Sequence, residues 1–144
     1  LGRVCKERLC YFQEEIDKKL YPSFMLEKFF EAVKKGRAEN FFLTKAEFTY
    51  LSGKATESDY IHYISILLGD INLYSFSGTE KIVSVECGEA EPFVSMRGYS
   101  FISHFNTVIR YEGKTGNKKM SVERIIRFNG RWVVLAVRAG SYLF

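Results

Sequence analysis

Residues 118–138 read KKMSVERIIRFNGRWVVLAVR, two strand-like runs on either side of Asn129-Gly130. Both turn residues tolerate a positive φ, so the pair favours a two-residue type I′ turn between antiparallel strands. We therefore predict a β-hairpin with strands at 118–128 and 131–138. Apolar residues make up 47% of the 144 residues, which suits one folded domain built around this hairpin and excludes a disordered chain.

The two-residue turn also predicts the register of the hairpin, because each residue before the turn faces one after it. One face would carry the pairs Phe128 with Arg131, Ile126 with Val133, Arg124 with Leu135 and Val122 with Val137. The other would carry Arg127 with Trp132, Ile125 with Val134, Glu123 with Ala136 and Ser121 with Arg138. The first face is almost wholly apolar, so we expect helices to cover it and the second face to point outward.

The first half of the chain has the spacing of helices. The positions Leu26, Phe29, Phe30 and Val33 form one apolar stripe that ends at Gly36. Thr44 with Glu47, and Thr56 with Asp59, have the spacing of a capping box and open two further helices. The last of these should end at Leu68-Gly69 and bury the stripe Tyr60, Ile61, Ile64, Leu67 and Leu68.

After Gly69 the apolar period becomes two, which predicts strands at 71–76, 81–87 and 99–112 before the hairpin. In the strand 99–112 we expect Phe101, Phe105, Ile109 and Tyr111 on the covered face, and His104, Asn106, Val108 and Arg110 on the outer face. Helices followed by hairpin-connected strands predict an α+β fold with an antiparallel sheet. Residues 1–144 form a single domain in this interpretation, and 1–21 form a peripheral N-terminal helix.

Two segments resemble a known family. Phe29-Phe30-Glu31-Ala32-Val33-Lys34-Lys35-Gly36 closes a helix, and Phe128-Asn129-Gly130-Arg131-Trp132-Val133-Val134 closes a long meander. Over residues 24–138 the chain is similar to the nuclear transport factor 2-like (NTF2-like, SnoaL-like, cystatin-like fold) superfamily. The resemblance implies a curved sheet wrapped on helices into a cone with an internal pocket, and commonly a homodimer. The alternative is a simpler cystatin-like fold of one helix on a sheet.

Arg124 breaks the apolar pattern of the covered face, and a guanidinium buried alone is costly. Three explanations remain open: an ion pair with a helix carboxylate, a pocket residue for an anionic or carbonyl group, or a bulge that turns it outward. The candidate pocket residues are Arg124, Tyr111, Thr107 and His62.

Catalytic residues are not evident. An enzyme of this superfamily would need a carboxyl or imidazole deep in the cone, but Asp17 and Asp59 fall on exposed helix positions and Asp70 in a turn. No metal-ligand spacing and no glycine-rich phosphate loop occurs, so we assign no cofactor. A non-catalytic binding or assembly module is therefore favoured, with a SnoaL-like isomerase or dehydratase as the alternative.

The outer sheet face suggests a partner. Ile125, Trp132 and Val134 would form an exposed apolar stripe bordered by Arg127, Arg138, Arg110 and His104. Trp and Arg beside apolar residues are typical of protein interfaces, so we predict a homodimer or a protein partner there. The alternative is that another part of the chain covers the stripe.

The charge distribution and the cysteine positions limit which further partners and sites we expect. Residues 97–144 hold nine basic and two acidic side chains, either a solvated surface or a face for an anion. Nucleic acid is an improbable partner because no single-strand-binding motif is present, and no run of residues is long enough to span a membrane. Cys5, Cys10 and Cys87 read as ordinary small residues, with a bond from Cys5 or Cys10 to Cys87 left open. We expect a soluble domain, and the start at Leu1 leaves room for a removed signal segment.

Overall fold

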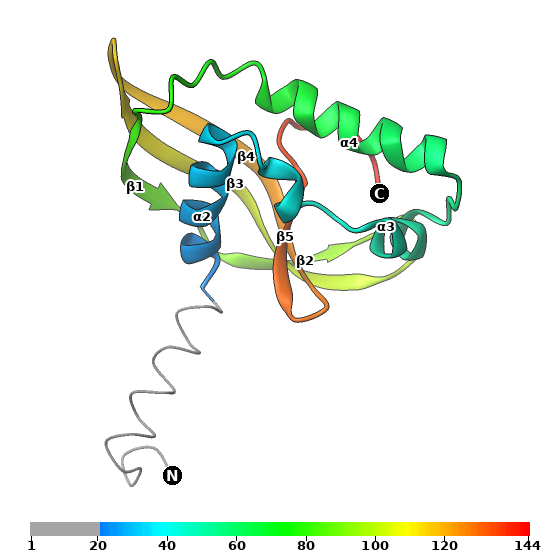
Figure 1. Cartoon of the computed structure of the whole chain (residues 1–144). Helices are drawn as coiled ribbons and strands as arrows, with labels where there is room; N and C mark the ends of the chain where they lie inside the picture. The colour runs from blue at the N-terminus through cyan, green and yellow to red at the C-terminus, as the bar shows by residue number, and fades with distance from the viewer. Residues whose placement is uncertain (1–20) are drawn as a thin grey trace, which may run out of the picture.

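The computed structural model describes residues 21–144, so the expected N-terminal helix and Cys5 and Cys10 lie outside the described residues. Within residues 21–144 four helical elements come first and five strands follow; Figure 1 labels the three α-helices and the strands. The helical elements are α2 (Pro22–Lys34), the 3-10 helix η2 (Ala38–Phe41), α3 (Lys45–Ser52) and α4 (Glu57–Ile71). The strands are β1 (Lys81–Glu86), β2 (Ala90–Val94), β3 (Ser100–Gly113), β4 (Gly116–Phe128) and β5 (Arg131–Ala136). The α+β class is confirmed.

The five strands form one open antiparallel sheet in the order β1-β3-β4-β5, with β2 also paired to β3. The long strands β3 and β4 curve beneath the helices, α2 lies across their near side, and α4 runs along the top (Figure 1). The C-terminal segment after β5 passes between the sheet and α4 (Figure 1). The sheet therefore carries helices over one side rather than closing on itself.

Strand β3 is bent where its neighbour is interrupted. Glu86 of β1 pairs with Val108, and Ala90 of β2 pairs with His104. Glu86 and Ala90 are four positions apart, and so are their partners Val108 and His104. The strands β1 and β2 therefore keep the same register along β3 on both sides of the break at 87–89. Asn106 lies opposite this break with a φ of 54°, a left-handed conformation that asparagine adopts more readily than most residues.

The turn at Asn129-Gly130 and the register beside it are confirmed. Asn129 and Gly130 have φ values of 49° and 75°, and Phe128 pairs with Arg131. The next three pairs, Arg127–Trp132, Ile126–Val133 and Ile125–Val134, are also as predicted. Beyond them the prediction is wrong, because the register shifts and Arg124 pairs with Ala136 rather than with Leu135. The extra residue on β5 is a β-bulge, which displaces every later pair by one position.

The helix ends follow local capping. Thr44 and Glu47 form both bonds of the capping box at the start of α3, and Gly53 closes that helix in the left-handed conformation. The Thr56 side chain accepts a hydrogen bond from the Asp59 N–H at the start of α4. Both predicted helix starts are therefore confirmed.

The end of α4 was predicted wrongly. The helix continues through Gly69 to Ile71, and the predicted strand 71–76 does not form. Its fully packed positions are Tyr63, Leu67, Asp70 and Ile71, whereas Ile61 is 55% exposed. Leu67 is buried as predicted and Tyr60, Ile64 and Leu68 are partly buried against the core, so of the predicted stripe only Ile61 departs. The strand β2 was not predicted, since Glu91 and Pro92 interrupt its apolar pattern.

A cluster of aromatic rings joins the helices to the C-terminal segment. The Phe48 ring stacks on Tyr63 with centroids 5.0 Å apart, and the rings of Tyr142 and Phe144 pack against Tyr63 at 5.5 and 5.4 Å. Tyr63 is fully buried and its hydroxyl accepts a hydrogen bond of 3.2 Å from the Leu43 N–H. Burial also raises the pKa of Tyr63. This tyrosine is therefore a neutral structural group.

Replacing Tyr63 with Phe removes the only acceptor of the buried Leu43 N–H among residues 21–144. We expect Tyr63→Phe to lower the free energy of unfolding by about 1–3 kcal/mol, the usual cost of an unsatisfied buried donor. Tyr60 is the matched control, because its hydroxyl donates to the Leu43 carbonyl at 2.8 Å from a half-buried position. Tyr60→Phe should cost less than about 1 kcal/mol in the same urea titration. Equal losses would contradict this account of Tyr63.

Candidate functional site

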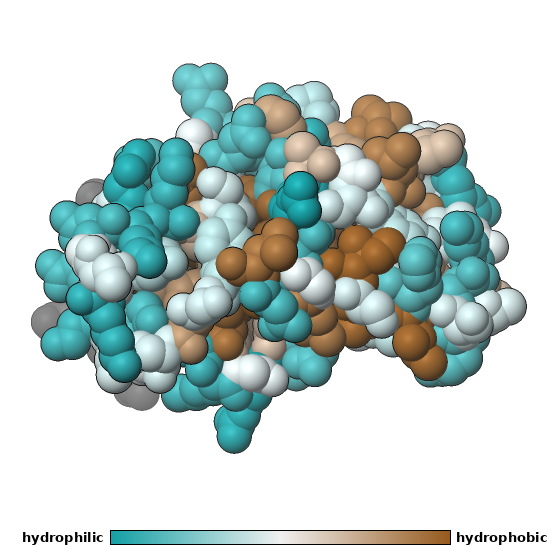
Figure 2. Space-filling model, turned by 90° about the horizontal axis from the view of Figure 1, so that it is seen from above, coloured by the Kyte–Doolittle hydropathy of each residue, from teal (hydrophilic) through white to brown (hydrophobic). Residues whose placement is uncertain are grey.

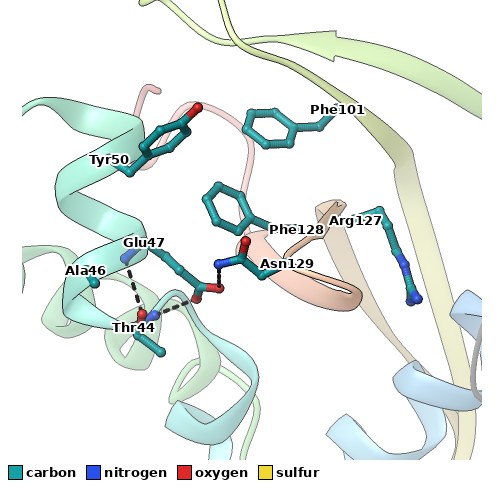
Figure 3. Close-up of a pocket in the computed structure, with 8 residues that line it drawn as sticks. All are labelled: Thr44, Ala46, Glu47, Tyr50, Phe101, Arg127, Phe128 and Asn129. Carbon is teal, nitrogen blue, oxygen red and sulfur yellow. Dashed lines mark hydrogen bonds between the residues drawn. The ribbon is translucent and has the colours of Figure 1, made fainter.

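A pocket of about 630 Å³ opens between the start of α3 and the turn that joins β4 to β5. Figure 3 shows its eight lining residues, which come from α3 and its N-cap, from β3 and from the end of β4. They are Thr44, Ala46, Glu47, Tyr50, Phe101, Arg127, Phe128 and Asn129. The pocket therefore joins the helical first half of the chain to the strands of the second half.

One wall of the pocket consists of aromatic rings. Phe101 and Phe128 lie on adjacent strands with their rings stacked 5.2 Å apart, and Tyr50 meets the Phe128 ring edge-on at 5.9 Å. Tyr50 is also stacked on Tyr99 at 4.5 Å, although half of Tyr50 remains exposed. In Figure 3 these rings surround the open space, whereas the Arg127 side chain points away from it. The wall therefore offers apolar, flat contact surface to a ligand.

The opposite wall is a polar network centred on Glu47, which is 6% exposed. Its carboxylate accepts hydrogen bonds from the Thr44 N–H at 2.9 Å and from the Asn129 Nδ2 at 3.1 Å, and it forms an ion pair with Arg131. Arg131 also donates to the Phe42 carbonyl at 3.2 Å. The two carboxylate oxygens are thus occupied by donors from the Thr44 backbone, Asn129 and Arg131. Glu47 therefore anchors the start of α3 to the turn between β4 and β5.

The predicted pocket residues do not meet at one place. Thr107 is fully buried and its hydroxyl donates to the Val122 carbonyl at 3.0 Å. Tyr111 packs against Phe30 with ring centroids 5.1 Å apart, and burial raises its pKa. His62 lies on the exposed side of α4, with its ring 6.5 Å from that of Tyr142.

Arg124, the fourth predicted pocket residue, lies outside the ring-lined pocket. Its guanidinium donates to the Ser103 hydroxyl at 3.0 Å and lies 4.0 Å from the Glu91 carboxylate. Of the three explanations offered for this residue, neither a helix carboxylate nor a bulge that turns it fully outward fits, because Glu91 is on β2 and the Arg124 side chain is only 19% exposed.

The expected apolar stripe on the outer face of the sheet is not exposed, so this prediction is wrong. Trp132 is 7% exposed and both Ile125 and Val134 are fully buried. Val133 and Leu135 on the other face of β5 are buried as well. Strand β5 is thus covered on both faces by its own chain, and the alternative of intramolecular cover applies.

The four polar residues expected at the border of that stripe have separate environments. His104 is buried, with its ring 5.3 Å from Trp132 and its Nδ1 3.2 Å from the Cys87 carbonyl. Arg127 lies over the Trp132 ring at 5.7 Å. Arg110 forms an exposed ion pair of 3.1 Å with Glu86. Arg138 lies 4.0 Å from Asp70, whose Oδ2 has no hydrogen-bond partner among residues 21–144.

Phe105 and Asp70 also depart from expectation. Phe105 was placed on the covered face but is 39% exposed, because Asn106 beside it adopts the left-handed conformation. Asp70 was placed in a turn but belongs to the last turn of α4 and is buried. Ile109 and Tyr111 are buried as predicted. The bend in β3 therefore exposes a ring that strict alternation would bury.

Exposed apolar residues also occur away from the ring-lined pocket. Ile61 and Leu73 are 55% and 65% exposed on and just after α4. Seen from above, hydrophobic residues on this face lie in several groups with hydrophilic residues between them (Figure 2). None of the helices in residues 21–144 is long and apolar enough to span a membrane.

The described residues contain no cluster of three or more histidine, cysteine or acidic side chains that could hold a metal ion. Cys87 is half-buried, and burial raises the pKa of its thiol, which disfavours the reactive thiolate. Neither a metal centre nor a cysteine nucleophile is therefore supported within residues 21–144.

The ring-lined pocket was missed at the level of sequence, although two signals for it were present. The capping box at Thr44 and Glu47 and the turn at Asn129-Gly130 were each recognised as local structure. Nothing in either pattern indicates that the Asn129 side chain donates to a carboxylate 82 residues earlier. Tyr50 and Phe101 carried no signal beyond their apolar character.

A second carboxylate is held by a loop at another hollow, formed by the segment before β1 and the turn between β3 and β4. Glu80 accepts hydrogen bonds from the Ser77 N–H at 2.8 Å, the Ser77 hydroxyl at 3.0 Å and the Gly78 N–H at 2.9 Å. These donors, the Ser77 N–H foremost, lower the pKa of Glu80 to about 2. The charged form of Glu80 therefore holds this loop in place.

For the pocket, we expect Glu47→Gln to lower the free energy of unfolding by about 2 kcal/mol, because the amide leaves Arg131 without its charge partner. The matched control is Glu57→Gln, which breaks an exposed ion pair with Lys45 and should cost less than about 0.5 kcal/mol. Urea titration of both variants measures the difference. Similar losses of unfolding free energy in the two variants would show that the Glu47 network stabilises the fold no more than an exposed ion pair does.

For the loop, we expect the stability of Glu80→Gln relative to the wild type to depend on pH. The lowered pKa means that the Glu80 carboxylate stabilises the fold above its ordinary pKa of 4.5 and that this contribution disappears as the pH falls toward 2. The urea midpoints of wild type and variant should therefore differ at pH 7 and converge near pH 2.5. Glu112→Gln is the control, since Glu112 has no polar partner in the described part of the chain. A gap that stays constant with pH would contradict the assignment.

Comparisons with known proteins give no relative from which a function could be taken. No family model, no curated protein and no solved structure matches this chain. The resemblance to the NTF2-like superfamily therefore stays a prediction. What residues 21–144 show is an α+β fold with an open five-stranded antiparallel sheet and a ring-lined pocket at one end of it.

Proposed function

We propose that this chain is a non-catalytic binding module of the NTF2-like type, which takes a small apolar or aromatic molecule in the pocket between α3 and the β4–β5 turn. The observation that carries the proposal is the wall of three rings, Tyr50, Phe101 and Phe128, beside an open volume of about 630 Å³. Pockets for small ligands in proteins have about this size and are lined mostly by apolar and aromatic side chains.

The polar wall supports binding rather than catalysis. The carboxylate of Glu47 and the amide of Asn129 are bonded to each other and to other groups of the chain. A general acid or base must exchange a proton with the ligand, and a carboxylate fixed in an ion pair is poorly suited to this. An isomerase or dehydratase would need a free group here, so the catalytic alternative has no specific observation in its favour.

Contacts within the chain also hold the walls in place. The turn is fixed to α3 through Asn129 and Arg131, and the Tyr50 ring is stacked on Tyr99. A preformed pocket loses less conformational entropy on binding than one that must assemble around its ligand. Assembly through the outer sheet face lacks comparable support, because Trp132 and its apolar neighbours are buried.

The test uses N-phenyl-1-naphthylamine, a neutral aromatic dye whose fluorescence rises in apolar sites. We expect saturable binding to the wild type and affinity about tenfold lower in Phe101→Ala, because the variant removes one ring of the wall. Tyr50→Ala is a second variant, chosen because Tyr50 is half exposed and lies outside the buried core. Ile61→Ala, an exposed apolar position on α4 outside the pocket, is the matched control. Wild-type affinity in both pocket variants, with normal thermal unfolding, would refute the proposal.

A further inference from the structure

Arg124 occupies an unusual position away from the ring-lined pocket. Its guanidinium lies over the rings of Phe93 on β2 and Phe105 on β3, at 4.8 Å from each centroid. Its side chain is only 19% exposed. Contact with two rings confines an arginine side chain and adds a cation–π attraction at each ring. The charged group is thus withdrawn from most of its water and held in one place.

The Ser103 hydroxyl fixes the orientation of this guanidinium. Ser103 is fully buried, and its hydroxyl donates to the Glu91 carbonyl at 3.0 Å. Because its single proton is used there, its lone pairs face Arg124, whose Nη1 donates to them at 3.0 Å. Ser103 is a positioning residue, since it sets the plane of the guanidinium without contacting solvent.

Most donors of Arg124 are unused. A guanidinium has five N–H groups, and in residues 21–144 only Nη1 has a hydrogen-bond partner. The carboxylate of Glu91 lies 4.0 Å from that same Nη1, too far for a hydrogen bond. The atoms Nε and Nη2 are not among the fully buried unpartnered atoms, so each keeps some contact with solution. A guanidinium of this kind presents a planar fork that matches a carboxylate.

The aromatic rings beside Arg124 indicate which kind of carboxylic acid would bind there. Phe105 lies beside the guanidinium and is 39% exposed. The Phe93 ring is stacked on the Phe101 ring, with centroids 6.4 Å apart. Flat apolar surface therefore adjoins the unused donors. We propose that Arg124 is the centre of a second binding site, which takes the carboxylate of a small aromatic acid on Nε and Nη2 with its ring against Phe105.

The charged centre of this site lies outside the proposed pocket, although the Phe101 ring belongs to the surroundings of both. Arg124 and Phe105 do not line that pocket, and Glu91 is half exposed and able to turn away from an incoming anion. The proposal therefore predicts two binding events with different selectivity, a neutral apolar one at the pocket and an anionic one at Arg124. Loss of one need not entail loss of the other.

The test is an NMR titration of the ¹⁵N-labelled protein with benzoate, and with benzamide as a neutral molecule of the same shape. We expect saturable shifts of amides in β2, β3 and β4 around Arg124 with benzoate, and at least about tenfold weaker binding of benzamide, because a charge-assisted bond is lost. Equal binding of the two molecules would overturn the proposal.

Variants make the assignment specific. Arg124→Lys keeps the charge but loses the fork, so benzoate affinity should fall about tenfold. Glu91→Gln removes the competing anion and should raise it severalfold. Arg110→Lys, at an exposed arginine already paired with Glu86, is the matched control and should bind as the wild type does. Unchanged benzoate affinity in Arg124→Lys would overturn the proposal. Unchanged dye binding in that variant shows that the ring-lined pocket is intact, so the two proposals can fail separately.

Discussion

The arrangement of this fold depends on how one carboxylate is removed from water. Glu47 belongs to α3, and its charge can be buried only where donors surround it, because an unpaired carboxylate in the interior is very costly. Thr44 supplies one donor from the same helix turn, and Asn129 and Arg131 supply the others from the turn between β4 and β5. The hairpin therefore fixes where the start of α3 lies against the sheet. Tyr50, three residues after Glu47 on the same helix, then meets Phe128 and completes the ring-lined pocket.

The sequence predicted the parts of this arrangement that depend on neighbouring residues. The spacing of Thr44 and Glu47 reports a helix start, and Asn129-Gly130 reports a tight turn, because each depends on backbone geometry within four residues. The α+β class follows from the change of period after the helices. What could not be predicted is that these two local features bond to each other across more than 80 positions. That contact depends on the path of the whole sheet.

Failures of the prediction in the sheet have two causes. Strict alternation along each strand assumes one covered and one exposed face, but β5 is covered on both. The continuous apolar run from Trp132 to Val137 is typical of a strand buried on both sides, and it was the available signal against an exposed stripe. The shift at Leu135 and the left-handed Asn106 then displace residues from their expected faces. Such irregularities leave little trace in a single sequence.

The basic excess of the last third of the chain has two different physical meanings. Arg110 is half exposed and meets Glu86 at 3.1 Å, so water and a nearby carboxylate satisfy its charge. Arg124 is mostly withdrawn from water, yet its nearest carboxylate is 4.0 Å away and most of its donors face no acceptor in the described residues. Desolvation without full pairing raises the free energy of the charged group, and an incoming acceptor can lower it. The number of basic residues therefore says little about partners, whereas the burial and unused donors of one arginine give a specific chemical reason for binding.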